Sequence, residues 1–387
     1  MSLSPITRDA RVLRQLSVLA EFGDVTTVGF GDKPADAAEH IEVPSHLSTL
    51  PQTPLGVLNL AFRRLRSSET QAPAVSWMIE RLRVEMPFDL VVANDARVLA
   101  GAFAVSGGAP VWADMHEWAP EERTHVLRWR LLVAPLMDHL CRTYLPRAQA
   151  VSTVGGEIAD LYAARYGVQA VVVRNSSRRV ALSPTEVDES RVRLVHSGAA
   201  VQGRNIEGMI DVVRQLDARF TLDLYLVSPG ADQSYLESLK KRARGDARIV
   251  FQSPVAPSEL PAVLNQYDVG VFWIPPVHTN ARLTLPNKLF DFVQARLAIA
   301  VGPSIEMERI VRGYDIGVVS TSFALDDCAA SLESLDATRI RQFKANAGSA
   351  SPELSFEADA ERIRRIVREA ITVGRSAHAR KAGGAEK

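Results

Sequence analysis

Short apolar strands alternate with amphipathic helices along almost the whole chain, and this alternation constrains the fold more than any other feature. Such a pattern builds a parallel β-sheet covered by helices on both faces, so we expect an α/β fold. In the first half we expect strands at 25–28, 90–93, 111–113, 150–153 and 170–173, with helices at 11–21, 74–83, 123–144 and 156–166. After a polar stretch at 174–191 the alternation restarts, with strands at 192–196, 222–227, 248–251, 269–273, 298–301 and 317–319.

The polar stretch divides the chain into two halves of the same kind, which suits its 387 residues because single hydrophobic cores rarely grow this large. We therefore expect two Rossmann-like domains facing a cleft. Their expected bounds are 1–178 and 179–355, followed by a last helix at 356–372 that packs on the first domain and a disordered tail at 373–387. Ligands of such sheets bind outside the carboxyl ends of the strands, so functional residues should follow strands.

The beginning of the chain departs from this pattern. A doubly wound domain normally opens on an apolar strand, and Met1–Thr7 is too short and too polar to be a good one. We expect either a vestigial first strand or a start site that truncates it.

Composition excludes several classes of protein. A formal net charge of zero argues against a general nucleic-acid binder, and two distant cysteines, Cys141 and Cys328, give no disulfide framework and fit a reducing cytoplasm. No apolar run is long enough to span a bilayer, so any membrane contact is peripheral. The segment Leu55–Arg66 ends in three arginines after an apolar face. We favour a solvated amphipathic helix there and keep docking on an anionic membrane as the alternative.

The motif Leu285–Asp291 reads Leu-Pro-Asn-Lys-Leu-Phe-Asp and carries the strongest functional signal. Asn287 is a plausible N-cap, and the amino end of a helix attracts anions. Lys288 adds a full positive charge where a diphosphate would lie, and Asp291 follows on the same helix face, where it could bind ribose hydroxyls. The alternative is a capped helix with a surface Lys–Asp pair.

A second motif, His196–Asn205, follows the first strand of the second half. Gly198 lets the backbone approach a ligand, and the planar guanidinium of Arg204 is suited to phosphate oxygens. The spacing imitates a P-loop, but Arg204 and Asn205 stand where that motif needs Lys and then Ser or Thr. A P-loop NTPase is therefore disfavoured, and an ordinary βα turn is the alternative.

A third motif, Asp114-Met115-His116-Glu117, follows the strand at 111–113. Burying polar groups at the end of a strand costs free energy, so such residues are either exposed or kept for a function. His116 is therefore a candidate functional residue, with a hydrogen-bonded structural histidine as the alternative. Pro120 rules out the zinc-protease motif, and the other histidines show no ligand spacing, so we expect no metal site. Asp9 and Arg11 lie at the mouth of the first helix and face either the cleft or solvent.

Taken together these residues resemble the GT-B glycosyltransferases, and specifically the retaining glycosyltransferase family four, over nearly the whole chain. The resemblance rests on the Asp9–Arg14 opening, the Asp114-x-His116-Glu117 loop, Arg174-Asn175, Arg204–Glu207, Tyr267–Gly270 and Leu285–Asp291. It implies that Arg204 and Lys288 hold the donor diphosphate, that Asp291 binds the ribose and that His116 contacts the donor sugar. This sequence departs from the family at two places. Asp291 stands where the family usually has Glu, and Leu283 and Thr284 stand near the position of a second Glu that the family often has seven residues earlier. The short N-terminus also puts the first glycine loop of the family in doubt.

The resemblance implies a cytoplasmic enzyme of the kind that builds polysaccharides. It would move a sugar from a nucleoside diphosphate to a hydroxyl acceptor with retention of configuration, and it would need no metal or cofactor and no nucleic acid. Two alternatives are a sugar-nucleotide epimerase of the same fold and a non-catalytic nucleotide-sugar-binding relative. A nicotinamide oxidoreductase is a distant third, because no G-x-G-x-x-G loop is present.

Overall fold

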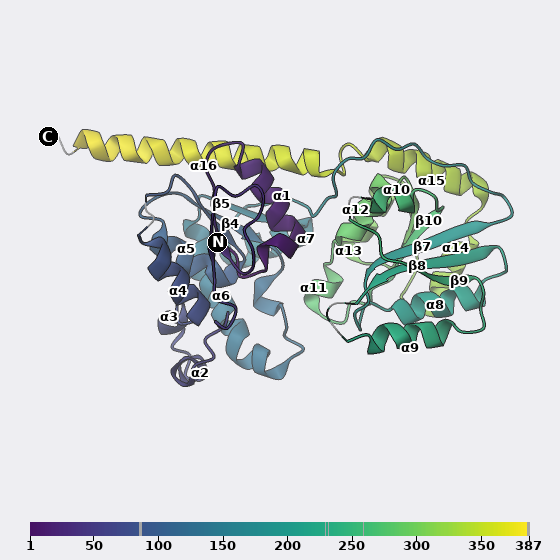
Figure 1. Cartoon of the computed structure of the whole chain (residues 1–387), viewed down its shortest axis with the longest axis horizontal. Helices are drawn as coiled ribbons and strands as arrows, with labels where there is room; N and C mark the ends of the chain where they lie inside the picture. The colour runs from purple at the N-terminus through teal and green to yellow at the C-terminus, as the bar shows by residue number, and fades with distance from the viewer. Residues whose placement is uncertain (85–86, 229, 231, 258, 385–387) are drawn as a thin grey trace. The chain divides into compact units, whose positions relative to one another are not determined.

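The computed structural model describes residues 1–84, 87–228, 230, 232–257 and 259–384, with side chains of the last helix described through Gly374. The chain forms two compact units (Figure 1). Unit 1 comprises Met1–Arg174, His278–Asn280 and the residues from Asp359 onward, and unit 2 comprises Asn175–Val277 and Ala281–Ala358. The units meet at 174/175 and 358/359, close to the expected boundaries at 178 and 355, but the three residues 278–280 were not expected in unit 1.

Unit 1 contains two parallel sheets, with strand orders β1-β2 and β3-β4-β5-β6. Their strands are β1 (Thr26–Gly29), β2 (Glu39–Glu42), β3 (Val91–Asn94), β4 (Val111–Met115), β5 (Ala150–Thr153) and β6 (Ala170–Val172). The helices are η1 (Ile6–Arg8), α1 (Ala10–Leu19), α2 (Pro54–Ala61), α3 (Leu65–Ser68), α4 (Pro73–Leu82), η2 (Ala96–Val98), α5 (Leu99–Val105), η3 (Ala119–Glu121), η4 (Trp129–Val133), α6 (Ala134–Tyr144), η5 (Leu145–Arg147) and α7 (Gly156–Tyr166). The expected α/β class with parallel sheets is confirmed.

Residues 1–5 lie between the two sheets of unit 1. Ser2 forms a parallel bridge with Asn94 of β3, and Pro5 forms one with Phe30, just after β1. The amino-terminal segment therefore occupies the position of the first strand, and the strands of unit 1 run in the order third, second, first, fourth, fifth, sixth, seventh. This is the doubly wound order, and its switch point lies between residues 1–5 and β3.

Unit 2 is built on one six-stranded parallel sheet with the order β12-β11-β10-β7-β8-β9. Its strands are β7 (Val192–Ala199), β8 (Phe220–Val227), β9 (Ile249–Gln252), β10 (Val269–Phe272), β11 (Ala298–Val301) and β12 (Gly317–Val319). Its helices are α8 (Ile206–Gln215), α9 (Ser234–Ala243), α10 (Leu260–Leu264), α11 (Thr279–Arg282), α12 (Asn287–Gln294), α13 (Ile305–Gly313), α14 (Leu325–Glu333) and α15 (Ala337–Ala350). The first two residues of α11, Thr279 and Asn280, belong to unit 1. The order is again doubly wound, with the switch point between β7 and β10, where ligands of such sheets bind.

The last helix, α16 (Phe356–Gly384), packs on unit 1, where it contacts the turn that follows α1. Arg364 donates to both carboxylate oxygens of Glu21 at 2.7 and 2.8 Å, and the guanidinium of Arg368 lies over the ring of Phe22. The expected end of this helix at residue 372 is wrong, because α16 continues to Gly384. Only Gly374 and Gly383 interrupt the helix-forming residues of that stretch before its end, and isolated glycines weaken a helix without ending it. Residues 385–387 lie outside the described residues.

The expected single helix at 123–144 is divided into the π-helical η4 and the α-helix α6. Pro135 lies in the first turn of α6 and has no amide hydrogen, so it cannot continue an α-helical hydrogen-bond ladder from the residues before it.

Candidate functional site

In unit 2, Gly198, Arg204 and Lys288 come together although 90 residues separate the first from the last in sequence. Gly198 lies near the carboxyl end of β7 with φ 133°, a conformation that side chains other than hydrogen rarely tolerate. A Cβ atom at this position would collide with Nζ of Lys288 and would lie 3.9 Å from Nη1 of Arg204. The glycine thus gives the lysine ammonium room beside the strand.

Lys288 is 7% exposed, and its ammonium lies 5.1 Å from the ring centre of Phe272. Among the described residues, no ion pair involves Lys288 or Arg204. Burial, together with the charge of Arg204, lowers the pKa of Lys288 to about 7, and burial lowers the pKa of Arg204. Two cations that destabilise each other in a buried place are stabilised by a bound anion, so this cluster is suited to phosphate oxygens.

His196 of β7 belongs to the same cluster, and the sequence analysis missed it as a site residue. Its side chain is buried, and one ring nitrogen, Nδ1, lies 2.9 Å from the carbonyl oxygen of Val271. Nδ1 must donate in that bond, so Nε2 is left as an acceptor, and it has no hydrogen-bond partner among the residues that the structure describes. Burial and the charge of Lys288 lower the pKa of His196 to about 3, so the ring is neutral. His196 ends the expected apolar strand at 192–196, so the sequence pattern assigned it to the strand and not to the site.

The structure corrects one expectation at α12, the N-cap, and gives Asp291 a hydrogen-bond partner. Asn287 is the first helical residue rather than the N-cap, which is Pro286, and no side chain caps this helix. Its first amides are therefore not satisfied by a cap and remain suited to an anion. The carboxylate of Asp291 accepts a hydrogen bond from the hydroxyl of Ser177 in the linker, so a ribose would have to share this carboxylate with Ser177.

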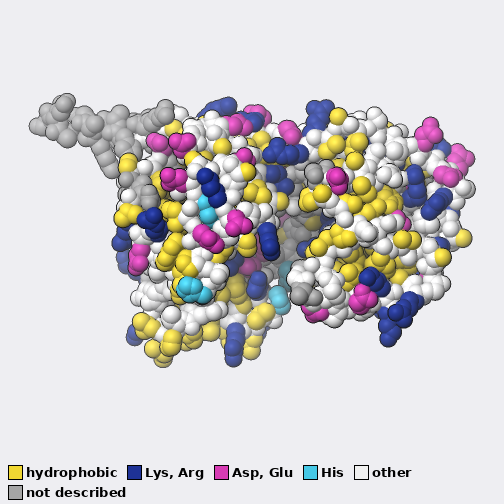
Figure 2. All heavy atoms as spheres, in the orientation of Figure 1, with side chains coloured by type: hydrophobic (Ala, Val, Ile, Leu, Met, Phe, Trp, Pro, Cys, Tyr) yellow, Lys and Arg dark blue, Asp and Glu magenta, His cyan; other side chains and the backbone are white. Residues whose placement is uncertain are grey.

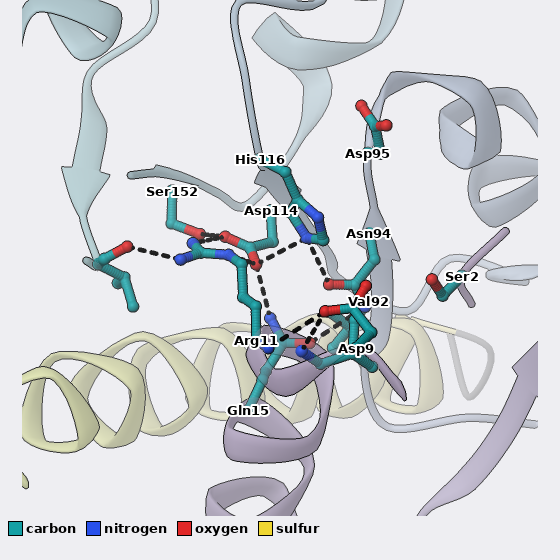
Figure 3. A network of polar contacts seen from close by, with 12 residues as sticks. Ser2, Asp9, Arg11, Gln15, Val92, Asn94, Asp95, Asp114, His116 and Ser152 are labelled. Carbon is teal, nitrogen blue, oxygen red and sulfur yellow. Dashed lines mark hydrogen bonds and ion pairs between the residues drawn. The ribbon is translucent and has the colours of Figure 1, made fainter. Parts of the chain in front are cut away.

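In unit 1, Asp114 is the centre of a buried polar network (Figure 3). Its two carboxylate oxygens accept hydrogen bonds from Nε and Nη2 of Arg11 at 2.8 and 2.6 Å. Gln15 and Ser152 donate to the same carboxylate at 3.1 and 2.5 Å. Burial alone would raise the pKa of Asp114, but Arg11 and His116 hold it well below its usual range. Asp114 is therefore ionised and held by groups from α1 and β5 and by His116, just after β4.

His116 follows β4 and points its Nε2 atom into this network (Figure 3). Nε2 lies 3.4 Å from Oδ2 of Asp114 and 3.3 Å from Oδ1 of Asn94, whose Nδ2 donates to Gln15. Because both neighbours of Nε2 are acceptors, Nε2 carries the hydrogen and Nδ1 is the nitrogen left for a ligand. Burial opposes protonation of the ring, but the hydrogen bond to Asp114 raises the pKa of His116 overall.

The structure also corrects the expectation that Arg11 faces a cleft or solvent, whereas Asp9 is partly exposed at the start of α1. The carboxylate of Asp9 caps α1 by accepting from the amides of Arg11 and Val12. The side chain of Arg11 is 7% exposed and, besides Asp114, donates to the carbonyl oxygen of Val173 at 2.7 Å. Both residues therefore hold the structure that carries His116.

Glu117, directly after His116, is a further candidate that the sequence analysis did not select. Burial, followed by the charges of Glu122 and Asp95, raises its pKa to about 7. One oxygen of Glu117 accepts a hydrogen bond from Nδ2 of Asn280 at 3.1 Å. Asp95, at the end of β3, has φ 82°, which is strained for a residue with a side chain and is most often tolerated at functional sites.

Within the described residues, no three or more His, Cys, Asp and Glu side chains are placed to hold a metal ion. No described helix is both long and apolar enough to cross a membrane.

No family model matches the chain, and no curated protein matches it in sequence. Solved structures do match over nearly its whole length. HepE from Anabaena in complex with UDP-glucose has a TM-score of 0.68 at 14% identity, covering 95% of this chain and 98% of that one. Sucrose-phosphate synthase from Thermosynechococcus elongatus has a TM-score of 0.70 at 12% identity, covering 94% and 93%. WaaG, a glycosyltransferase involved in lipopolysaccharide biosynthesis, has a TM-score of 0.60 at 12% identity, covering 95% and 96%.

The fold of this chain is therefore that of the GT-B glycosyltransferases, as the sequence resemblance implied.

Proposed function

We propose that the protein is a glycosyltransferase that moves a sugar from a nucleoside diphosphate to a hydroxyl acceptor, with retention and without a metal. The observation that carries this proposal is the cationic cluster of Arg204 and Lys288 beside Gly198, at the switch point of the unit 2 sheet. In this proposal Arg204 and Lys288 neutralise the leaving diphosphate, which is the task that a divalent cation has in other transferases. The fold shared with HepE, whose structure contains UDP-glucose, supports the same ligand class.

The remaining roles follow the family resemblance. Asp291 would bind the ribose while it keeps its contact with Ser177, and the first amides of α12, which begins at Asn287, would face the phosphates. His116 would contact the donor sugar through Nδ1, since Nε2 is held by Asp114 and Asn94.

Lys288→Ala is expected to weaken binding of a nucleoside diphosphate about 10- to 150-fold, because one charge-assisted hydrogen bond contributes about 1.5–3 kcal/mol. Binding of the nucleoside should hardly change, because it has no phosphate. Titration calorimetry with UDP, GDP, ADP and their nucleosides measures both. Lys241→Ala, at an exposed position in the same unit, is the matched control. Equal losses for nucleoside and diphosphate would show that Lys288 is structural.

The same measurement tests the electrostatics of the cluster. Since the pKa of Lys288 is about 7 without ligand, the wild-type affinity should fall as the pH rises above 7 and the ammonium loses its proton. This fall should disappear in Lys288→Ala. Gly198→Ala should reproduce the loss of affinity by displacing the ammonium, whereas Gly203→Ala, also at positive φ but with open space around it, should not.

Turnover assays separate the proposed reaction from its alternatives. The protein is incubated with a panel of nucleotide sugars, with and without hydroxyl acceptors and with and without a chelator. A glycoside formed only with acceptor and unaffected by chelation supports the proposal. A new sugar isomer from donor alone supports an epimerase, and diphosphate binding with no turnover supports a binding protein. Loss on chelation that a divalent ion restores would contradict the metal-free mechanism.

The exposed surface of unit 1 around α2 supports a peripheral membrane contact as part of this function. We define the α2 surface as the exposed apolar side chains of Leu55, Val57, Leu58, Phe62, Val126, Leu127 and Leu131, which are half of the 14 large apolar side chains exposed among the described residues. Val126 and Leu127 lie just before η4 and Leu131 lies within it, and η4 packs against α2. Figure 2 shows hydrophobic side chains gathered in this part of unit 1 with basic ones beside them.

Six exposed arginines belong to the same two segments of the chain as the α2 surface, and Arg123 pairs with the less exposed Glu122; they are Arg63, Arg64, Arg66, Arg123, Arg128 and Arg130. Exposed apolar side chains with arginines close in sequence fit the interface of an anionic bilayer, with the apolar groups in the acyl boundary and the guanidinium groups at the headgroups. The membrane contact that was kept as the alternative at Leu55–Arg66 thus gains a second segment, 123–131, in this proposal.

Vesicle sedimentation tests this contact. The protein should bind vesicles of phosphatidylcholine with phosphatidylglycerol and not vesicles of phosphatidylcholine alone. Replacing Arg63 and Arg64 by Ser should weaken binding about fivefold per arginine, since each contributes about 1 kcal/mol near such a surface. Leu58→Ser with Phe62→Ser should weaken it as well, whereas Val250→Ser, an exposed apolar position in unit 2, should not. Dimerisation through these residues without vesicle binding would assign the surface to a second copy instead.

A further inference from the structure

The ring of Phe272 faces the ammonium of Lys288 in unit 2. Phe272 is the last residue of β10 and is buried, and Nζ of Lys288 lies 5.1 Å from the centre of its ring. A ring face attracts a cation at distances up to about 6 Å. Among the described residues Lys288 has no carboxylate partner and no hydrogen bond, so the ring is its one direct contact that favours a positive charge.

The charged and titratable groups around Lys288 do not take over this task. Arg204, just before α8, is a second cation and disfavours the charge of Lys288. His196 on β7 is neutral, because burial and the charge of Lys288 lower its pKa to about 3. Asp291, three residues later on α12, favours the ammonium, but its carboxylate accepts a hydrogen bond from the hydroxyl of Ser177.

His196 holds Phe272 in place at the point where β7 and β10 stop pairing. The last paired residues of the two strands are Val195 and Gly270. Beyond them, Nδ1 of His196 donates to the carbonyl oxygen of Val271 at 2.9 Å. The imidazole also stacks on the ring of Phe272, with 5.8 Å between the ring centres and 8° between the ring planes. The backbone before Phe272 and its ring are thus both fixed from β7.

We propose that Phe272 is a positioning residue of the donor site, where the face of its ring keeps the ammonium of Lys288 charged and in place for the diphosphate. This inference rests on the proposed function. A ring face suits the task better than a carboxylate, because it attracts the cation without accepting its hydrogen bonds and without repelling an incoming anion. The three N–H donors of the ammonium stay available for phosphate oxygens.

The ring acts on the proton equilibrium of Lys288. Burial and the charge of Arg204 lower the pKa of Lys288 to about 7. The ring works in the opposite direction, because it attracts only the protonated form. A weaker ring should therefore lower the pKa of Lys288 further, so that the ammonium loses its proton at a lower pH and the diphosphate then meets a neutral amine.

The experiment replaces Phe272 by phenylalanines that carry one, two or three ring fluorines. Fluorines withdraw electron density from the face of the ring and change its volume little, so they weaken its attraction for a cation. The pKa of Lys288 is measured without ligand by magnetic resonance of lysine labelled at Cε, and Lys288→Arg assigns its signal among seven lysines. The pKa should fall stepwise, by about one pH unit with three fluorines.

Two controls come from the same unit. Lys344 is also buried, with a pKa lowered to about 8, but its ammonium donates to the hydroxyl of Thr185 and the carbonyl oxygen of Tyr267. The pKa of Lys344 should not change in the fluorinated forms. The same fluorinated residues at Phe220, a fully buried ring at the start of β8, should leave the pKa of Lys288 unchanged.

Calorimetry with UDP, GDP and ADP connects the ring to the donor. Three fluorines at Phe272 should lower diphosphate affinity about tenfold at about pH 8 and hardly at all at about pH 5, where Lys288 is protonated in every form. The titration of the ligand itself cancels, because the forms are compared at the same pH.

A pKa of Lys288 that stays constant on fluorination, or that falls together with the pKa of Lys344, would overturn the inference. An equal loss of affinity at both pH values would overturn it as well, because a ring that only fills space predicts such a loss. If the pKa falls as expected and none of the three diphosphates binds to any form, the contact between ring and ammonium stands and the proposed function fails.

Discussion

Arg11→Ala is expected to lower the free energy of unfolding by about 3–5 kcal/mol, the usual cost of removing one partner of a buried ion pair. Asp114 would keep its charge in a place where its side chain is 1% exposed, with only Gln15, Ser152 and His116 to compensate it. The carbonyl oxygen of Val173 would also lose its donor. Urea unfolding at neutral pH, monitored by circular dichroism, gives the difference.

Arg8→Ala is the matched control, because Arg8 is exposed three residues earlier in the same segment, and it should change stability by less than about 0.5 kcal/mol. The pH dependence adds a second readout. Arg11 lowers the pKa of Asp114 below its unfolded value of about 3.9, so the stabilisation is present above that pH and is lost as the pH falls toward the pKa of the folded protein. If Arg11→Ala lowers the free energy of unfolding as little as Arg8→Ala does, the ion pair of Arg11 and Asp114 contributes little to the stability of the fold.

Arg11 also shows where sequence reasoning stops. Its helix was expected, since the apolar spacing of α1 is visible in the sequence, but its partner Asp114 lies 103 residues away. A sequence pattern with period 3.6 shows which face of a helix is buried, but it does not show which charged residue that face contacts. Asp291 is a second case, because its partner Ser177 belongs to the linker, whose path no periodicity predicts.

The features that could be predicted depend on local pattern or on topology. Most strand positions agree within a few residues, whereas β2 was missed because Glu39-His40-Ile41-Glu42 carries only one apolar residue. The convergence of Gly198, Arg204 and Lys288 was expected because loops after parallel strands meet at one edge of the sheet. His196 shares that edge but lies inside an apolar strand, and only its unpartnered Nε2 in the folded chain reveals it.

His116→Ala is expected to reduce turnover by about a hundredfold or more, the scale usual for one positioned catalytic side chain. This prediction rests on the proposed contact of Nδ1 with the donor sugar as charge develops at the reacting carbon. An interaction made mainly in the transition state lowers kcat when it is removed and leaves ground-state binding nearly unchanged. Affinity for the free nucleoside diphosphate, measured by calorimetry, should therefore stay within about twofold.

The structure sharpens this test, because His116 is not simply exposed. Its side chain is 22% exposed, and its Nε2 atom donates toward Asp114 and Asn94, so alanine also removes a donor from a buried carboxylate. His116→Gln separates the two roles, since an amide nitrogen can still donate to Asp114 but offers no ring nitrogen to a sugar. Glutamine should restore the melting temperature and leave turnover as low as in the alanine variant. Recovery of both stability and turnover in His116→Gln would show that His116 only supports the fold around Asp114.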